Sequence, residues 1–152
     1  MNKRYAQNIL IISSVLVAFW AGFVSSISFM EAWMKFRAPG ITLPLGLGIG
    51  KLVFSSLNLV EWFFLVACIA LLGLYHKSFR FLLSHHLLQV ILAILLIQTF
   101  WLLPGLVQRA DLIMAGSEPA DSNIHIYYVV LEIIKVGLLV ALAVRQGLKT
   151  SR

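Results

Sequence analysis

Four long runs of apolar residues, separated by short polar segments, make up most of this 152-residue chain. The runs cover about residues 8–30, 48–75, 81–103 and 122–144. Each can cross the roughly 30 Å hydrocarbon core of a bilayer as a helix, which takes about 20 residues. Apolar and polar residues do not alternate within the runs, as they would in the strands of a membrane barrel. The pattern predicts an all-α, four-helix transmembrane bundle, with residues 1–152 forming a single membrane domain.

The connections between the runs carry local signals of their own. Residues 36–50 are apolar but contain prolines and glycines, so we expect an interfacial or shallow re-entrant segment. Pro104 and Gly105 are expected to end the third run, and residues 105–121 to form a polar cap. The connection at 76–79 is very short, so the second and third runs should form an antiparallel hairpin.

The composition narrows the class of protein. Hydrophobic residues make up 61% of the chain and charged residues 12%, whereas soluble domains are about 45–50% apolar and about 25% charged. A water-soluble globular enzyme is therefore excluded, and the lipid bilayer is the expected partner of the outer surface. The single cysteine, Cys68, permits no internal disulfide and excludes a membrane thiol–disulfide enzyme, which needs a reactive pair.

The net charge of +6 is distributed unevenly between the two ends of the predicted bundle. Basic residues are scattered rather than clustered, so we expect no nucleic-acid partner. The side that holds both termini and the 76–80 turn carries seven basic residues and no acidic ones. They are Lys3, Arg4, Lys77, Arg80, Arg145, Lys149 and Arg152. The opposite side is balanced, so the positive-inside rule predicts cytoplasmic termini and a multi-pass protein of the inner (plasma) membrane.

Three ionisable residues, Glu61, Glu132 and Lys135, fall inside the predicted spans. Each such residue costs roughly 2.5–3.5 kcal/mol on insertion scales and usually faces the bundle interior. On the fourth run, His125, Tyr128, Glu132 and Lys135 fall within an arc of about 80° at 100° per residue. The fourth helix is therefore expected to present one polar face to its neighbours.

The second run shows a matching polar face. Four polar residues fall within an arc of about 120°: Lys51, Ser55, Asn58 and Glu61. The second and fourth runs cross in the same direction, so Glu61 and Glu132 should reach a similar depth. We predict a polar column that opens to the external side, with both glutamates and Lys135 at its base. The leading hypothesis is that it binds a proton, an ion or a small polar ligand, for transport or sensing.

Other functions fit the same residues. In a membrane-embedded enzyme acting on a lipid-soluble substrate, His125, Tyr128 and Glu132 would be acid–base groups. As an accessory subunit, the chain would only assemble with a larger membrane complex. A further alternative is that the intramembrane polar groups only hold helices together, and the sequence is also compatible with a homo-oligomer. The spacing of residues leaves these alternatives open.

The histidines form a separate group. His76, His85 and His86 lie at the predicted cytoplasmic end and are weak candidates for a metal or haem site, because no acidic residue on that side completes it. His125 lies at the opposite membrane face. About one membrane thickness would separate it from His86, so a haem cannot bind both histidines. We predict no bound cofactor and no metal.

Three segments of the chain have a layout that resembles that of other membrane proteins. They read FMEAWMKFRAPGITLPLGLGIGKLVFSSLNLVE, WLLPGLVQRADLIMAG and SNIHIYYVVLEIIK. A short loop follows the first span, a proline ends the third, and a histidine opens the fourth. In this layout the chain resembles small four-span bacterial integral membrane proteins of unknown function. The resemblance implies the fold and brings no activity with it.

Overall fold

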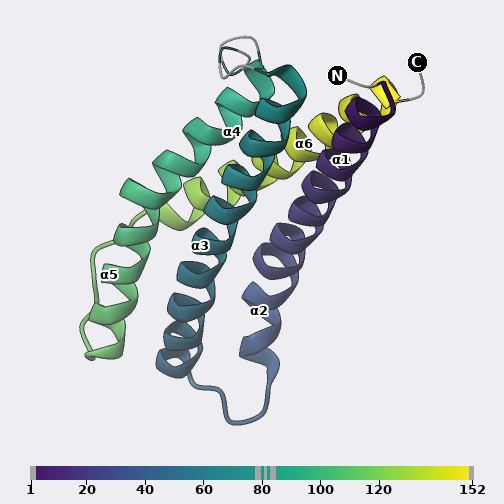
Figure 1. Ribbon diagram of the computed structural model, residues 1–152. Coiled ribbons are helices and arrows are strands. Elements are labelled where there is room, and N and C mark those ends of the chain that lie inside the picture. The colour runs from purple at the N-terminus through teal and green to yellow at the C-terminus, as the bar shows by residue number, and fades with distance from the viewer. Residues whose placement is uncertain (1–2, 78–79, 81, 83–84, 151–152) are drawn as a thin grey trace.

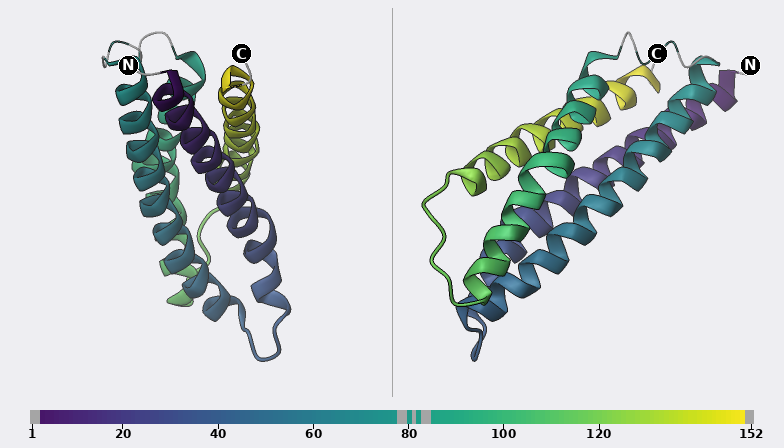
Figure 2. Two further views of the ribbon diagram at one scale, coloured as in Figure 1. Left: turned by 45° about the vertical axis from the view of Figure 1, so that its right-hand side comes forward. Right: turned by 90° about the vertical axis from the view of Figure 1, so that its left-hand side faces the viewer.

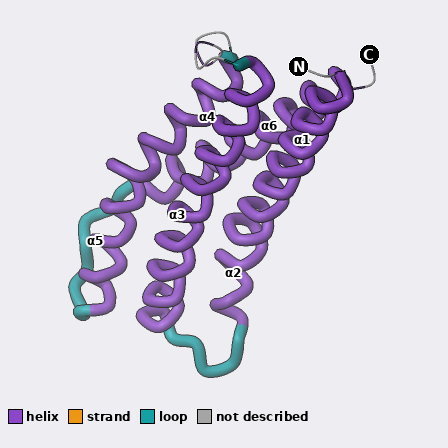
Figure 3. The backbone as a smooth tube through the Cα atoms, viewed as in Figure 1, coloured by secondary structure: helices purple, strands orange, loops and turns teal. Residues whose placement is uncertain are grey.

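The computed structural model describes residues 3–77, 80, 82 and 85–150. Its helices form four long rods (Figure 1). The first rod comprises α1 (Lys3–Ser25), the π-helical η1 (Ser26–Glu31), α2 (Ala32–Met34) and the 3₁₀-helical η2 (Lys35–Arg37). The second is α3 (Leu43–His76). The third comprises α4 (His86–Ile97), the π-helical η4 (Gln98–Leu102) and α5 (Leu103–Met114), and the fourth is α6 (Ile124–Thr150). The described residues contain no strand (Figure 3).

The rods pack as a bundle, as predicted. Helix α1 packs mainly on α6 and α3, while α3 also packs on α5 and α4 contacts α6. The start of α1 and the end of α6 lie together, since the Gln7 amide donates to the Thr150 carbonyl at 3.3 Å. Helices α3 and α4 run in opposite directions (Figure 2), although much of the predicted 76–79 turn lies outside the described residues.

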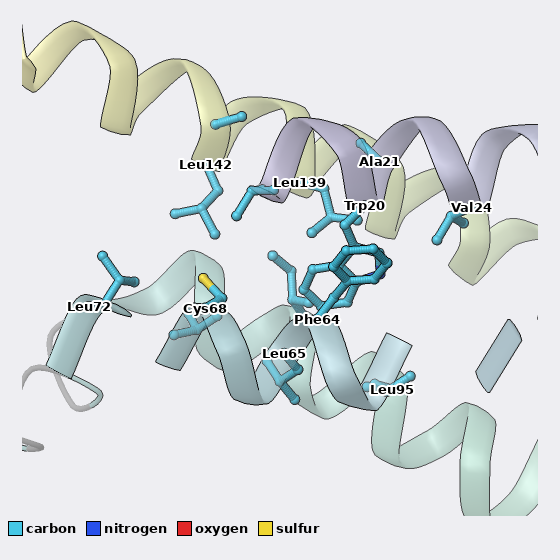
Figure 4. Close-up of a cluster of buried hydrophobic side chains, with 14 of the residues drawn as sticks. Trp20, Ala21, Val24, Phe64, Leu65, Cys68, Leu72, Leu95, Leu139 and Leu142 are labelled. Atoms are coloured by element: carbon cyan, nitrogen blue, oxygen red, sulfur yellow. The ribbon is translucent and has the colours of Figure 1, made fainter. Parts of the chain in front are cut away.

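The core is apolar, as in a soluble protein, and it is the outer surface that differs from one. Trp20 stacks on Phe64 with ring centroids 6.0 Å apart, within a buried apolar cluster that also holds Cys68 and Leu139 (Figure 4). Large apolar side chains instead face outward along every rod, such as Leu59 and Phe100. All four rods are long and apolar enough to cross a bilayer. The chain is therefore a multi-pass membrane protein of four helices.

The expectation of an interfacial or shallow re-entrant segment at 36–50 is wrong in its re-entrant form. Only residues 38–42 connect the first two rods, and α3 begins at Leu43. The Thr42 hydroxyl accepts from the Leu45 N–H at 3.4 Å, and Pro44 occupies the first turn, where the fixed φ of proline suits a helix. Capping signals therefore outweigh Gly46, Gly48 and Gly50, which lie within the helix, while Gly40 lies in the turn before it.

Pro104 and Gly105 do not end the third rod. The helix continues through them to Met114, so the expected polar cap at 105–121 is half helical. Proline lacks an N–H and cannot bond to the carbonyl four residues earlier. Here the preceding turn is π-helical, with the Leu103 N–H bonded to the Gln98 carbonyl. The irregular backbone before Pro104 accommodates the ring without ending the helix.

Candidate functional site

Lys135 holds a group of fully buried polar side chains together in the middle of the bundle. Its ammonium Nζ lies 2.6 Å from Glu61 Oε1 and 3.1 Å from Glu132 Oε1. Nζ also donates to Gln98 Oε1 at 2.7 Å, and Gln98 Nε2 donates to Glu132 Oε1 at 3.1 Å. Trp20 donates its indole N–H to Glu61 Oε1 at 3.2 Å. We call these five residues the charge cluster; they come from α1, α3, η4 and α6.

The charge cluster is not electrically balanced. Two carboxylates face one ammonium, so the cluster carries −1 when both glutamates are ionised. All three ionisable side chains are buried, where an uncompensated charge is costly. Oε2 of Glu61 and Oε2 of Glu132 have no hydrogen-bond partner among the described residues. A proton or another cation would therefore find both an unmet charge and free acceptor oxygens here.

Asn58 belongs to a neighbouring network rather than to the charge cluster. Its amide donates to Thr99 Oγ1 at 2.9 Å, and the Trp62 indole donates to the same oxygen at 3.0 Å. The Thr99 hydroxyl bonds to the Leu95 carbonyl at 2.7 Å. This network ties α3 to η4 beside the cluster.

A cavity of about 550 Å³ lies at the end of the bundle away from the termini. It is enclosed by the first rod, α3, α5 and the first turns of α6. Most of its lining is apolar, and the aromatic rings are those of Phe29, Trp33, Phe36, Phe54 and Tyr128. Figure 2 shows α6 beginning part-way along the bundle, after the 115–123 connection rises from the end of α5.

Glu132 belongs to both the cavity and the charge cluster. Its side chain lines the cavity while its Oε1 atom contacts Lys135 and Gln98. Tyr128, one turn away on α6, is buried with its hydroxyl unpartnered among the described residues and packs edge-on against Phe54 at 5.6 Å. The cavity thus ends next to a buried carboxylate and a buried phenol.

The two lysines of the cavity wall are already paired. The Lys35 ammonium lies 3.2 Å from Glu31 Oε2, an ion pair that the i, i+4 spacing allows. Lys51 lines the cavity but contacts Asp111 at 2.7 and 2.9 Å near the surface. His125 lines the cavity and is exposed. Of the predicted column, His125, Tyr128, Lys51 and Glu132 therefore meet at the cavity.

The histidines at the other end form no recognisable metal site. The rings of His76 and His85 lie 4.9 Å apart edge-on, and His86 Nδ1 lies 3.1 Å from Gln89 Oε1. Over the described ranges, no group of three or more His, Cys, Asp or Glu side chains is placed to hold a metal ion.

Gln98, Trp20 and Lys35 are site residues that the sequence analysis did not identify. Gln98 had a signal, as an amide in the middle of a long uncharged apolar run. Trp20 had none, because tryptophan in a membrane protein most often marks an interface. Lys35 stands four residues after Glu31, a spacing that allows an ion pair, but helical spacing does not reveal which rings it meets.

Both π-helical segments contribute to the site. Segment η1 supplies Ser28 and Phe29 to the cavity, and η4 supplies Gln98 to the charge cluster. Single π-helical turns within α-helices occur frequently at functional sites. No protein-family model matches the chain, and no curated protein or solved structure shows significant similarity to it.

Proposed function

We propose that the cavity binds a small ligand and that the charge cluster exchanges a proton or cation as part of binding, in transport or sensing. The observation that carries the proposal is the position of Glu132, which lines the cavity and contacts Lys135. An event in the cavity thereby changes the charge balance of Glu61, Glu132 and Lys135 directly. In this role Glu61 and Glu132 share the exchangeable proton, and Lys135 is their counter-ion.

The proposed orientation places both termini in the cytoplasm and the cavity towards the external side of the inner membrane. The support is the charge distribution: basic residues predominate at the end where α1 begins and α6 ends. In this orientation Lys51 and His125 lie at the external mouth, and the ligand enters from outside or from the outer leaflet.

Infrared difference spectroscopy tests the proton exchange. Purified protein in lipid is compared at acidic and alkaline pH, and the carbonyl band of a buried protonated carboxyl group is followed. The wild type should show this band, and Glu61→Gln and Glu132→Gln should each reduce or shift it. Glu118→Gln is the matched control, because Glu118 is exposed in the 115–123 connection. A band that is identical in all four proteins would exclude the proposal.

A second candidate function is acid–base catalysis on a lipid-soluble substrate. It is favoured by one observation: His125, Tyr128 and Glu132 all line the same cavity. An absorption spectrum of the purified protein discriminates between the two, since a bound chromophoric cofactor would favour the enzyme. Under the ligand-binding proposal, the spectrum shows only the aromatic side chains.

A further inference from the structure

We propose that the ligand of the cavity is a lipophilic organic cation, an amine or quaternary ammonium or phosphonium group carrying apolar substituents. This inference rests on the proposed function and adds the chemical class of the ligand. It is argued from the rings of the cavity wall, the charge at its base and the nature of its lining.

The cavity wall already holds one ammonium group against aromatic faces. Lys35 Nζ lies 5.3 Å from the ring centroid of Phe54 and 5.5 Å from that of Phe36. The guanidinium carbon of Arg37 lies 4.5 Å from the ring of Trp33. Cations within about 6 Å of a ring centroid are attracted by its negative face. Rings that line the cavity thus stabilise two cations of the chain itself, and a cationic ligand would compete with Lys35 and Arg37 for these faces.

The base of the cavity offers acceptors and negative charge. Glu132 Oε2 and the Tyr128 hydroxyl are buried and have no partner within the part of the chain described. The charge cluster behind them carries −1 when both glutamates are ionised. A cationic ligand restores neutrality, whereas an anionic ligand adds a like charge in a low-dielectric region. The lysines of the wall do not reverse this preference, because Glu31 and Asp111 pair with them.

The size and lining of the cavity favour an organic cation over a metal ion. Its volume of about 550 Å³ lies within the range of about 300–1,000 Å³ that is typical of small-molecule sites. The lining is mostly apolar, and Glu132 is its only carboxylate among the described residues. A metal ion would lack coordinating side chains there. The apolar substituents of an organic cation would instead be surrounded by hydrophobic side chains.

The same electrostatics makes the cation compete with a proton. The groups that face Glu132 are Gln98 from η4, Glu61 from α3, and Lys135 and Tyr128 from its own helix. A proton on either glutamate removes the excess charge that attracts the ligand. Binding should therefore weaken as the pH falls, and binding of the cation should release a proton.

Two probes of the same shape and opposite charge test the inference. Binding of tetraphenylphosphonium and tetraphenylborate to the full-length protein in detergent is measured by equilibrium dialysis, at acidic and alkaline pH. The phosphonium should bind saturably and more tightly at alkaline pH. Glu132→Gln should weaken phosphonium binding about tenfold or more, because a buried charge partner of the ligand is lost. The same variant should abolish the pH dependence of binding. The borate should show no difference between wild type and variant.

Two variants of the cavity wall keep the test independent of the charge cluster. Trp33→Leu, at a side chain that is 47% exposed, should weaken phosphonium binding several-fold through the lost aromatic face. Lys35→Gln should strengthen binding, because it frees two rings and the Glu31 carboxylate. Equal binding of both probes, or phosphonium binding unchanged in Glu132→Gln and Trp33→Leu, would overturn the inference. If the infrared band of the carboxyl pair persists in that case, the proposed proton exchange stands and only the ligand class is wrong.

Discussion

At the scale of single residues, one ammonium group compensates the charge of the buried carboxylates in the bundle interior. Lys135 contacts Glu61, Glu132 and Gln98, and its side chain is fully buried. Without it, two carboxylates would face each other in a region that water does not solvate. Removing one partner of a buried ion pair is costly because the remaining charge is left uncompensated.

Lys135→Met should therefore destabilise the protein by about 3–5 kcal/mol. Combining it with Glu61→Gln and Glu132→Gln should recover most of this loss, because the interior is then neutral. Lys51→Met, on the exposed pair with Asp111, should change stability by about 1 kcal/mol at most. The measurement is the free energy of unfolding in mixed micelles titrated with SDS. If the triple variant is no more stable than Lys135→Met, charge balance is not what holds the cluster.

The sequence predicted the members of each polar face better than their partners. The 100° advance per residue places Glu132 and Lys135 on one side of α6 without knowledge of any other helix. Matching depth on two parallel spans also placed Glu61 beside them, and the structure adds Gln98 and Trp20. Those contacts depend on which helices are neighbours, and helical spacing carries no information about neighbours.

At the scale of helices, short departures from α-helical geometry position the site. Segment η4 turns Gln98 towards the charge cluster and Thr99 towards Asn58 and Trp62. It also precedes Pro104, so the missing proline N–H falls where the backbone is already irregular. A proline in an apolar run predicts the end of a helix, because the sequence alone does not show that the preceding turn is π-helical.

Close packing between the first rod and α3 depends on glycine. A Cβ placed on Gly46 would overlap the ring of Phe36, whereas a Cβ on Gly137 would meet no atom within 4 Å. Both glycines lie within helices, where replacement by alanine otherwise favours the helix by about 1 kcal/mol.

Gly46→Ala should therefore be less stable than Gly137→Ala by about 1–3 kcal/mol, the cost of overpacking. The displaced Phe36 ring should also weaken binding of tetraphenylphosphonium, while Gly137→Ala should leave binding unchanged. Thermal unfolding and the dialysis assay measure the two effects. Equal stability and equal binding in both variants would show that Phe36 moves aside freely and takes no part in the site.

At the scale of the whole molecule, charge and shape distinguish the two ends of the bundle. The start of α1 and the end of α6 lie together at the basic end, and the cavity lies at the opposite, electrically balanced end. The four-helix class was predictable from run length and hydropathy alone. The cavity was not, because it arises from where α6 begins relative to α5, which depends on packing rather than on hydropathy.

The proposed orientation predicts which engineered cysteines react from outside the cell. Ser117→Cys lies in the exposed 115–123 connection near the cavity end, and Lys149→Cys lies exposed near the end of α6. A membrane-impermeant maleimide should label Ser117→Cys in intact cells and Lys149→Cys only after the membrane is opened. The wild type is the blank, because its single cysteine, Cys68, is fully buried. Labelling of Lys149→Cys in intact cells would contradict cytoplasmic termini and would turn the cavity, with Glu132 at its base, towards the cytoplasm.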